Sequence, residues 1–312
     1  MRICSLLPGA TEVVAALGLA DSLVGISHEC DYPAAIRGVP VLVQPAVDSE
    51  SADSAGIDRQ VKALTSSGQP LYRLNDAAFA EARPDIILTQ ELCHVCAVTP
   101  HELERAMRSL PQRPEVLTLA PRSLADVIDD VERIAAAVGA ASKGRDLADV
   151  LRSRTAAVRD GRLRQPRPRV VCLEWLSPLY VGGHWIPEMV DAAGGQDVLG
   201  QPAQPSRQVT LEEVRAARPD IVIIMPCGFS VARTVSELSA LCRADLASSE
   251  LLRSAATTVV VDAGSYFSRP GPRLVDGVEL MADICAGTMP SGRADHAVRD
   301  LTGSVCLTGQ PL

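Results

Sequence analysis

Short apolar runs and amphipathic segments alternate along the first half of the chain. The apolar runs are rich in β-branched residues, which is the pattern of buried strands, and apolar residues between them recur at helical spacing. This alternation is typical of an α/β fold with a largely parallel sheet. The predicted strands and extended pieces cover residues 2–8, 23–27, 40–47, 85–89 and 115–119, and the predicted helices cover 9–18, 76–82 and 100–109.

Residues 123–161 carry the longest helical pattern in the sequence. Ser123 fits an N-cap, an acid follows in the first turn, and apolar residues recur every three or four positions up to Gly139. The pattern then resumes and ends before a Pro/Arg-rich boundary at residues 161–168. It predicts one long or once-broken helix with no strand beside it.

A phrase that occurs twice predicts two similar lobes. Ala-Arg-Pro-Asp-Ile stands at residues 82–86 and again at 217–221, each time opening an apolar run, and residues 2–8 resemble 169–175. A repeat of this length favours two α/β lobes over a solenoid. The predicted parts are an N-terminal lobe at 1–122 with a polar loop at 48–70 and a short helix at 58–64, a connecting helix at 123–161, a C-terminal lobe at 169–288, and a loose tail at 289–312.

Composition narrows the classes of function. The chain has 312 residues, 47% of them apolar, which is enough for two hydrophobic cores. A net charge of −8 with dispersed basic residues disfavours a nucleic-acid partner. Only Lys62 and Lys143 are lysines, which disfavours Schiff-base chemistry. No signal peptide or membrane span is expected, so the chain as written is predicted to be cytoplasmic, and periplasmic or at the cell surface only if an export signal is missing from the start.

The cysteines divide into core candidates and site candidates. Cys4, Cys172 and Cys285 fall inside apolar runs and are expected to be small core residues. The remaining candidates follow predicted strands, where open α/β sheets bind ligands. Thiolate and imidazole suit zinc or iron, and the hypothetical metal site consists of Cys93, Cys96, His28, Cys30 and Cys227.

The Cys-x-x-Cys formed by Cys93 and Cys96 is a weak motif by itself. A classical zinc finger is disfavoured because no second ligand pair lies near it. Core placement of both thiols remains an alternative to metal binding, and a redox sensor that uses these two thiols is a further hypothesis.

Polar and aromatic residues near strand ends are candidate ligand contacts. Trp175 and Trp185 are the only tryptophans, and their Gly/Pro-punctuated segment predicts a flat stacking surface. Arg269 either clamps an anionic ligand or pins its own loop. The glutamates either contact the ligand or form caps and lobe-bridging ion pairs. The candidate ligand-binding set is Pro8, Gly9, His28, Glu29, Cys30, Glu91, Glu174, Trp175, His184, Trp185, Tyr266 and Arg269.

Several of these stretches resemble the substrate-binding proteins of ABC importers for cobalamin and ferric siderophores. The resemblance rests on residues 5–12, the turn at 28–33, the repeated Arg-Pro-Asp-Ile strands and the long helix, and it covers roughly residues 1–288. More narrowly, the chain resembles a branch of that family that lacks a signal peptide and is often labelled cobalamin-binding. It implies two lobes joined by a rigid helix, a ligand between them, and a permease partner. It also implies a docking carboxylate on each lobe, matched by Glu212 and approximately by Glu102.

These observations lead to one expected function and one alternative. We expect a bilobed protein that binds a corrinoid, another metal chelate or a metal in the cleft between its lobes. The alternative is a cytosolic enzyme on the same scaffold. In that enzyme Cys93, Cys96 or Cys227 would act as nucleophile or metal ligand, with Glu91 or Glu174 as the acid–base partner.

Overall fold

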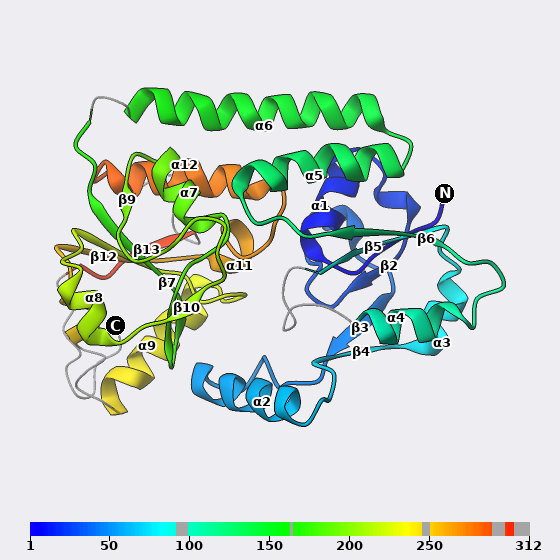
Figure 1. Cartoon of the computed structure of the whole chain (residues 1–312), viewed down its shortest axis with the longest axis horizontal. Coiled ribbons are helices and arrows are strands. Elements are labelled where there is room, and N and C mark those ends of the chain that lie inside the picture. Colours follow the sequence, from blue (N-terminus) through cyan, green and yellow to red (C-terminus); the bar gives the residue numbers. More distant parts are fainter. Residues whose placement is uncertain (92–98, 163–164, 245–249, 289–296, 303–312) are drawn as a thin grey trace.

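Two α/β lobes lie side by side and are bridged by a long helix (Figure 1). The computed structural model describes residues 1–91, 99–162, 165–244, 250–288 and 297–302. The N-terminal lobe, lobe 1, contains β1 Ile3–Ser5, α1 Pro8–Ala16, η1 Ala20–Ser22, β2 Leu23–Ser27, η2 Ala34–Ile36, β3 Val41–Pro45, α2 Ser54–Ser66, β4 Tyr72–Leu74, α3 Asp76–Ala82, β5 Ile86–Gln90, α4 Pro100–Met107 and β6 Glu115–Leu119. The C-terminal lobe, lobe 2, contains β7 Arg169–Leu176, β8 Leu179–Val181, α7 Ile186–Ala192, β9 Gln196–Asp197, β10 Arg207–Gln208, α8 Leu211–Ala216, β11 Ile221–Ile224, α9 Val231–Ala244, β12 Thr257–Val261, α11 Ala263–Tyr266, α12 Arg273–Cys285 and β13 Val298–Asp300.

Each lobe is built on one mainly parallel or mixed sheet, which confirms the predicted fold class. The sheet of lobe 1 has the order β4-β3-β2-β1-β5-β6, with only β4 antiparallel to its neighbour. The sheet of lobe 2 has the order β10-β8-β7-β11-β12-β13, with β7, β11 and β12 parallel. The parallel triplets β1-β5-β6 and β7-β11-β12 therefore correspond.

The repeated phrase has the same local structure in both lobes. In lobe 1 the backbone N–H of Arg2 donates to Asp85 Oδ2 at 2.7 Å, and the Arg2 guanidinium donates to the carbonyls of Ala82 and Arg83 at the end of α3. In lobe 2 the backbone N–H of Arg169 donates to Asp220 Oδ2 at 2.7 Å, and its guanidinium donates to the matching carbonyls at the end of α8. The arginine therefore satisfies helix-end carbonyls that would otherwise lack a partner, and the aspartate anchors the strand.

The connector is a helical hairpin of two helices, and the second of them bridges the lobes. Helix α5 Leu124–Ala137 begins at the predicted N-cap, where Ser123 and Asp126 form a capping box. The chain then breaks at Gly139, whose φ is +76°, and returns as α6 Ala141–Arg162. A Cβ on Gly144 of α6 would overlap the Ala135 side chain, so the two helices pack very closely. The once-broken form of the prediction is the correct one, and α6 spans both lobes (Figure 1).

Three sequence-based boundaries were wrong. The predicted strand at 2–8 ends at Ser5, because Pro8 already occupies the first turn of α1. The predicted short helix at 58–64 is the longer α2, which Asp53 caps by accepting from the Gly56 N–H. The tail is not loose throughout, since β13 adds an antiparallel edge strand to β12.

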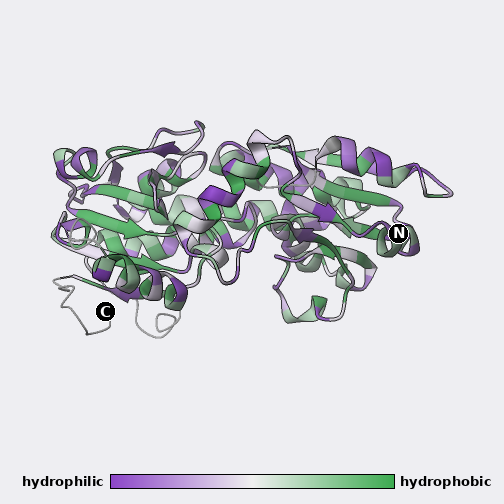
Figure 2. Ribbon diagram, turned by 90° about the horizontal axis from the view of Figure 1, so that it is seen from below, coloured by the Kyte–Doolittle hydropathy of each residue, from purple (hydrophilic) through white to green (hydrophobic). Residues whose placement is uncertain are grey.

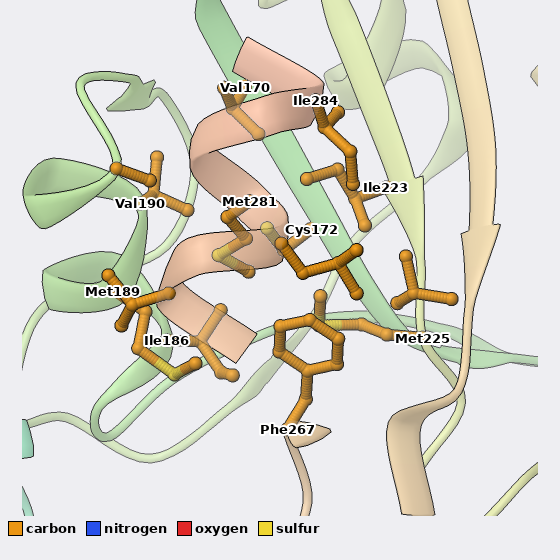
Figure 3. Packing of buried hydrophobic residues seen from close by; sticks show 14 of the residues in the cluster. Val170, Cys172, Ile186, Met189, Val190, Ile223, Met225, Phe267, Met281 and Ile284 are labelled. Carbon is orange, nitrogen blue, oxygen red and sulfur yellow. The ribbon is translucent and has the colours of Figure 1, made fainter. Parts of the chain in front are cut away.

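The hydrophobic cores follow the strands. Apolar residues concentrate on the sheets of both lobes, while the outer helices alternate polar and apolar faces (Figure 2). In lobe 2 the side chain of Cys172 lies among Ile223, Met225 and Met281 (Figure 3). Cys4 and Cys172 are 0% and 1% exposed, which confirms the prediction that both are core residues.

Candidate functional site

The candidate site lies between the lobes, where loops after the strands of one lobe meet those of the other. Lobe-to-lobe contacts occur at three levels. The innermost level is at the connector, where the backbone N–H of Leu124 in α5 donates to Glu188 Oε2 of α7 in lobe 2 at 2.7 Å. His184 of lobe 2 lies near Arg122 of lobe 1, and burial, with a smaller contribution from Arg122, lowers the pKa of this histidine.

The middle level joins the start of α1 to the loop before α12. A Cβ on Gly9 would overlap the carbonyl oxygen of Pro270, so only glycine permits this approach. Arg269, whose side chain is 13% exposed, forms a bidentate ion pair with Asp31. Gly9 and Arg269 were predicted as ligand contacts, and in the structure both lie where the two lobes touch.

A second ion pair at the middle level is almost completely buried. The guanidinium of Arg273 donates to both carboxylate oxygens of Glu12, at 2.9 Å and 2.6 Å, and also lies over the Tyr32 ring. Glu12 is 4% exposed. Burial raises the pKa of the Glu12 carboxyl, and the bond to Arg273 opposes that rise. This pair ties α1 of lobe 1 to α12 of lobe 2.

The outermost level involves the start of α2, which reaches lobe 2 (Figure 1). The backbone N–H and the hydroxyl of Ser54 both donate to Glu237 Oε1 of α9, at 2.8 Å and 2.5 Å. Trp175 Nε1 donates to the carbonyl of Ser54 at 3.2 Å, and Arg233 Nη2 donates to the carbonyl of Ala52 at 3.2 Å. The inter-lobe region is thus bounded on the side opposite the connector as well.

Aromatic groups from both lobes lie at this outer level. In lobe 2 the ring of Trp175 meets Phe229 edge to face with centroids 5.4 Å apart, and the Arg233 guanidinium lies 3.7 Å above the Phe229 ring. In lobe 1 the ring of His28 lies 5.8 Å from that of Tyr72. Trp175 and His28 are half-buried. Burial lowers the pKa of His28, and nearby Glu29 opposes this shift.

The structure contradicts the predicted role of Trp185. Its side chain is 5% exposed, belongs to the lobe 2 core, and donates from Nε1 to the carbonyl of Phe267 at 2.8 Å. Trp175 is therefore the remaining candidate for the predicted stacking surface. Tyr266 is half-buried against the same core.

Cys30 points into lobe 1 rather than toward a shared metal site. Its thiol lies 3.1 Å from Thr11 Oγ1, and Thr11 in turn bonds to Ser5. Burial raises the pKa of this thiol to about 11. Among the residues that the structure describes, no three His, Cys, Asp or Glu side chains come together as a metal site. Cys93 and Cys96 lie outside the described residues.

The other candidates occupy varied positions. Cys227 is exposed after β11, and its backbone N–H donates to the carbonyl of Glu174, which is half-buried at the end of β7. Glu29 and Glu91 are exposed, and Pro8 is half-buried at the start of α1.

The two candidate docking carboxylates both lie in the first turn of a helix but differ in exposure. Glu212 is exposed in the first turn of α8. Glu102 is half-buried in the first turn of α4, where its carboxylate accepts from Thr99 Oγ1 at 3.1 Å. In the internal repeat the counterpart of Glu212 is Ala77, next to Asp76 on α3, and Asp76 pairs with Arg105 of α4.

Sequence reasoning missed most of the residues that join the lobes. Glu12, Arg273, Ser54, Arg233 and Glu237 each make a contact more than 120 residues away in sequence. A glutamate inside the apolar helix pattern at 9–18 was a usable signal, because a buried carboxylate needs a partner.

In the part of the chain that the structure describes, no helix is both long and apolar enough to span a bilayer.

Comparisons with known proteins agree on the family. The profile of the periplasmic binding protein family matches residues 3–254. A vitamin B12-binding protein of Vibrio vulnificus (strain YJ016) is 25% identical over 228 residues, which cover 72% of this chain and 71% of that protein.

Solved structures share the same fold. A periplasmic haem-binding protein from Pseudomonas aeruginosa is 19% identical with a TM-score of 0.68, covering 96% of this chain and 97% of its own. The periplasmic vitamin B12-binding protein of Vibrio cholerae is 21% identical with a TM-score of 0.60, covering 91% and 96%. The two lobes, the bridging helix and the profile match together show that this chain belongs to the periplasmic binding protein family.

Proposed function

We propose that the chain is a ligand-binding receptor that holds a corrinoid between its lobes and delivers it to an ABC permease. The observation that carries the proposal is the enclosure of the inter-lobe region. A bond from α5 to α7 bounds it at the connector side, lobe-to-lobe bonds bound it at the α2 side, and Trp175, near the end of β7, makes one of these bonds. The name of the related Vibrio vulnificus protein supports the ligand class.

The charges around the region favour a corrinoid over haem. A corrin carries peripheral amides that donate hydrogen bonds, whereas haem carries anionic propionates. Glu29, which is exposed after β2, supplies a carboxylate acceptor for amides and would repel propionates. Arg269, an arginine that could attract a propionate, is already paired with Asp31. Trp175 offers the ring face for stacking.

The permease partner belongs to the same proposal. Glu212 is the candidate contact on lobe 2, because it is exposed in a first helical turn where nothing in its own lobe neutralises it through a described ion pair. On lobe 1 the candidates are Glu102 and Asp76, which is next to Ala77, the repeat counterpart of Glu212. A metal would be bound as part of the chelate ligand.

Binding of cyanocobalamin and of haemin, each measured by isothermal titration calorimetry, tests the ligand class. We expect cyanocobalamin to bind more tightly than haemin. Trp175→Ala should weaken cyanocobalamin binding about tenfold through lost stacking, whereas Trp175→Phe should weaken it less.

Three outcomes would overturn the proposal. These are tighter binding of haemin, binding of neither compound, and recovery of chemically altered cobalamin after incubation. The last result would indicate the enzyme alternative. Glu212→Ala is the matched control, since it should leave binding unchanged and reduce only the association with a permease.

A further inference from the structure

Residues 46–70, here called the strap, form a unit whose two ends meet on lobe 1. The backbone N–H of Ala46 donates to the carbonyl of Leu71 at 2.8 Å, which closes the base. Within the strap the backbone N–H of Asp48 donates to Gln60 Oε1 at 2.9 Å, and Asp53 caps α2. These internal bonds do not depend on either lobe.

Among the residues that the structure describes, the strap has little hydrophobic anchorage on its own lobe. Its buried apolar residue Ile57 is not a member of the hydrophobic clusters that form the described core of lobe 1. Most of α2 is exposed or half-buried. Segments with few buried apolar contacts open at low free-energy cost.

The strap is instead attached to lobe 2 by directional polar bonds at one end of α2. Ser54 is 0% exposed and donates twice to Glu237, while its carbonyl accepts from Trp175. Arg233 adds a bond to the carbonyl of Ala52. One carboxylate, that of Glu237, therefore accepts both bonds that Ser54 donates across the gap.

We propose that the strap is a gate that swings on its base at residues 46 and 71 and is latched by Glu237. When the latch opens, Trp175 loses its bond to Ser54 and the inter-lobe region becomes accessible from the α2 side. The contacts of Glu12 with Arg273 and of Asp31 with Arg269 stay closed, so the lobes keep their relative position. Passage of a ligand through the gate rests on the proposed function, whereas release of the strap does not.

The two tryptophans provide a direct readout. In protein labelled with 5-fluorotryptophan, ¹⁹F NMR should give one signal for Trp175, which contacts the strap, and one for Trp185, which lies in the core. Trp175→Phe assigns the signals. In Glu237→Ala the Trp175 signal should move and gain a solvent isotope shift, while the Trp185 signal stays fixed and shows that the variant is folded.

Hydrogen exchange provides a second readout without any ligand. The amides of residues 53–58 should exchange about tenfold faster in Glu237→Ala, because two bonds to a carboxylate are lost. Strands β5 and β11 should be unaffected. Glu212→Ala, an exposed glutamate of the same lobe, is the matched control. An unchanged Trp175 signal or unchanged exchange at 53–58 would overturn the latch.

Stopped-flow rates with cyanocobalamin test the gate. Glu237→Ala should release cyanocobalamin several times faster than the wild type does. If the NMR and exchange readouts change but the association and release rates of cyanocobalamin stay the same, the strap opens without gating and the proposal is wrong. If cyanocobalamin does not bind the wild type, the proposed function fails, and the NMR and exchange results alone decide whether the latch exists.

Discussion

The Cys30 thiol shows how a side chain with ligand chemistry becomes a structural group. It follows β2 at a strand end, where a ligand contact was predicted, yet it turns inward to Thr11 and is 8% exposed. Burial in an apolar setting raises its pKa to about 11, because the thiolate is poorly solvated there. Cys227, also at a strand end, is exposed.

We therefore expect iodoacetamide at pH 8 to modify Cys227 long before Cys30. With a pKa of about 11, only about one Cys30 thiol in a thousand is ionised at that pH, and the group is also shielded. A peptide-level mass-spectrometry time course measures the two rates, and equal rates would contradict the assignment. Because the folded pKa lies above the unfolded value, this thiol makes stability fall as pH rises from about 9 to about 11.

The Glu12–Arg273 pair gives a second prediction at this scale. Arg273→Met leaves a buried carboxylate without its partner, so the free energy of unfolding should fall by about 3–5 kcal/mol. The double variant Glu12→Gln/Arg273→Met removes both charges and should be less destabilised than Arg273→Met alone. Urea unfolding of both variants measures the difference, and an equal or larger loss in the double variant would refute the coupling.

At the scale of elements, the repeated arginine links each first strand to the helix before the next strand. Arg2 and Arg169 donate to the last carbonyls of α3 and α8 with closely similar geometry. The repeat in the sequence is thus a repeated helix-end interaction, and it accounts for the shared phrase in both lobes.

Arg2→Ala and Arg169→Ala should each lower the free energy of unfolding by about 1 kcal/mol, since each leaves helix-end carbonyls without a donor. The two effects should add, because the sites lie in different lobes. Chemical denaturation tests this, with the exposed Arg37→Ala as the control. If Arg37→Ala costs as much as Arg2→Ala, the helix-end interaction contributes nothing specific.

The missed elements depend in part on contacts with residues far away in the sequence. Strand β13 is three residues long and forms because it pairs with β12. Its residues show no hydrophobic periodicity from which a strand could be predicted. Helix α2 extends beyond the predicted 58–64 because Asp53 caps it and Ser54 is buried by lobe 2.

At the scale of the molecule, the approach of the lobes depends on Gly9. A side chain there collides with the backbone of Pro270, which cannot yield as a flexible side chain would. Gly9→Leu should lower the free energy of unfolding by about 1–3 kcal/mol and increase the radius of gyration. Gly161→Leu is the matched control, because a Cβ at Gly161 meets nothing within 4 Å. Small-angle scattering and urea unfolding that fail to distinguish the two variants would contradict this role.

The sequence by itself determined the fold class, the two lobes and the connecting helix, because these follow from local periodicity and from a phrase that occurs twice. The family was suggested by the resemblance of several motifs to known binding proteins, and the profile match shows it. The sequence also proposed Trp175 and His28 as ligand contacts, and this remains a prediction. The tertiary structure decided which polar groups contact the other lobe. Arg269 and Asp31 are 238 positions apart, and Ser54 and Glu237 are 183 apart, so no local pattern pairs them. Trp185 shows the same limit, since burial depends on how α7 packs against the rest of lobe 2 and not on the composition of its segment.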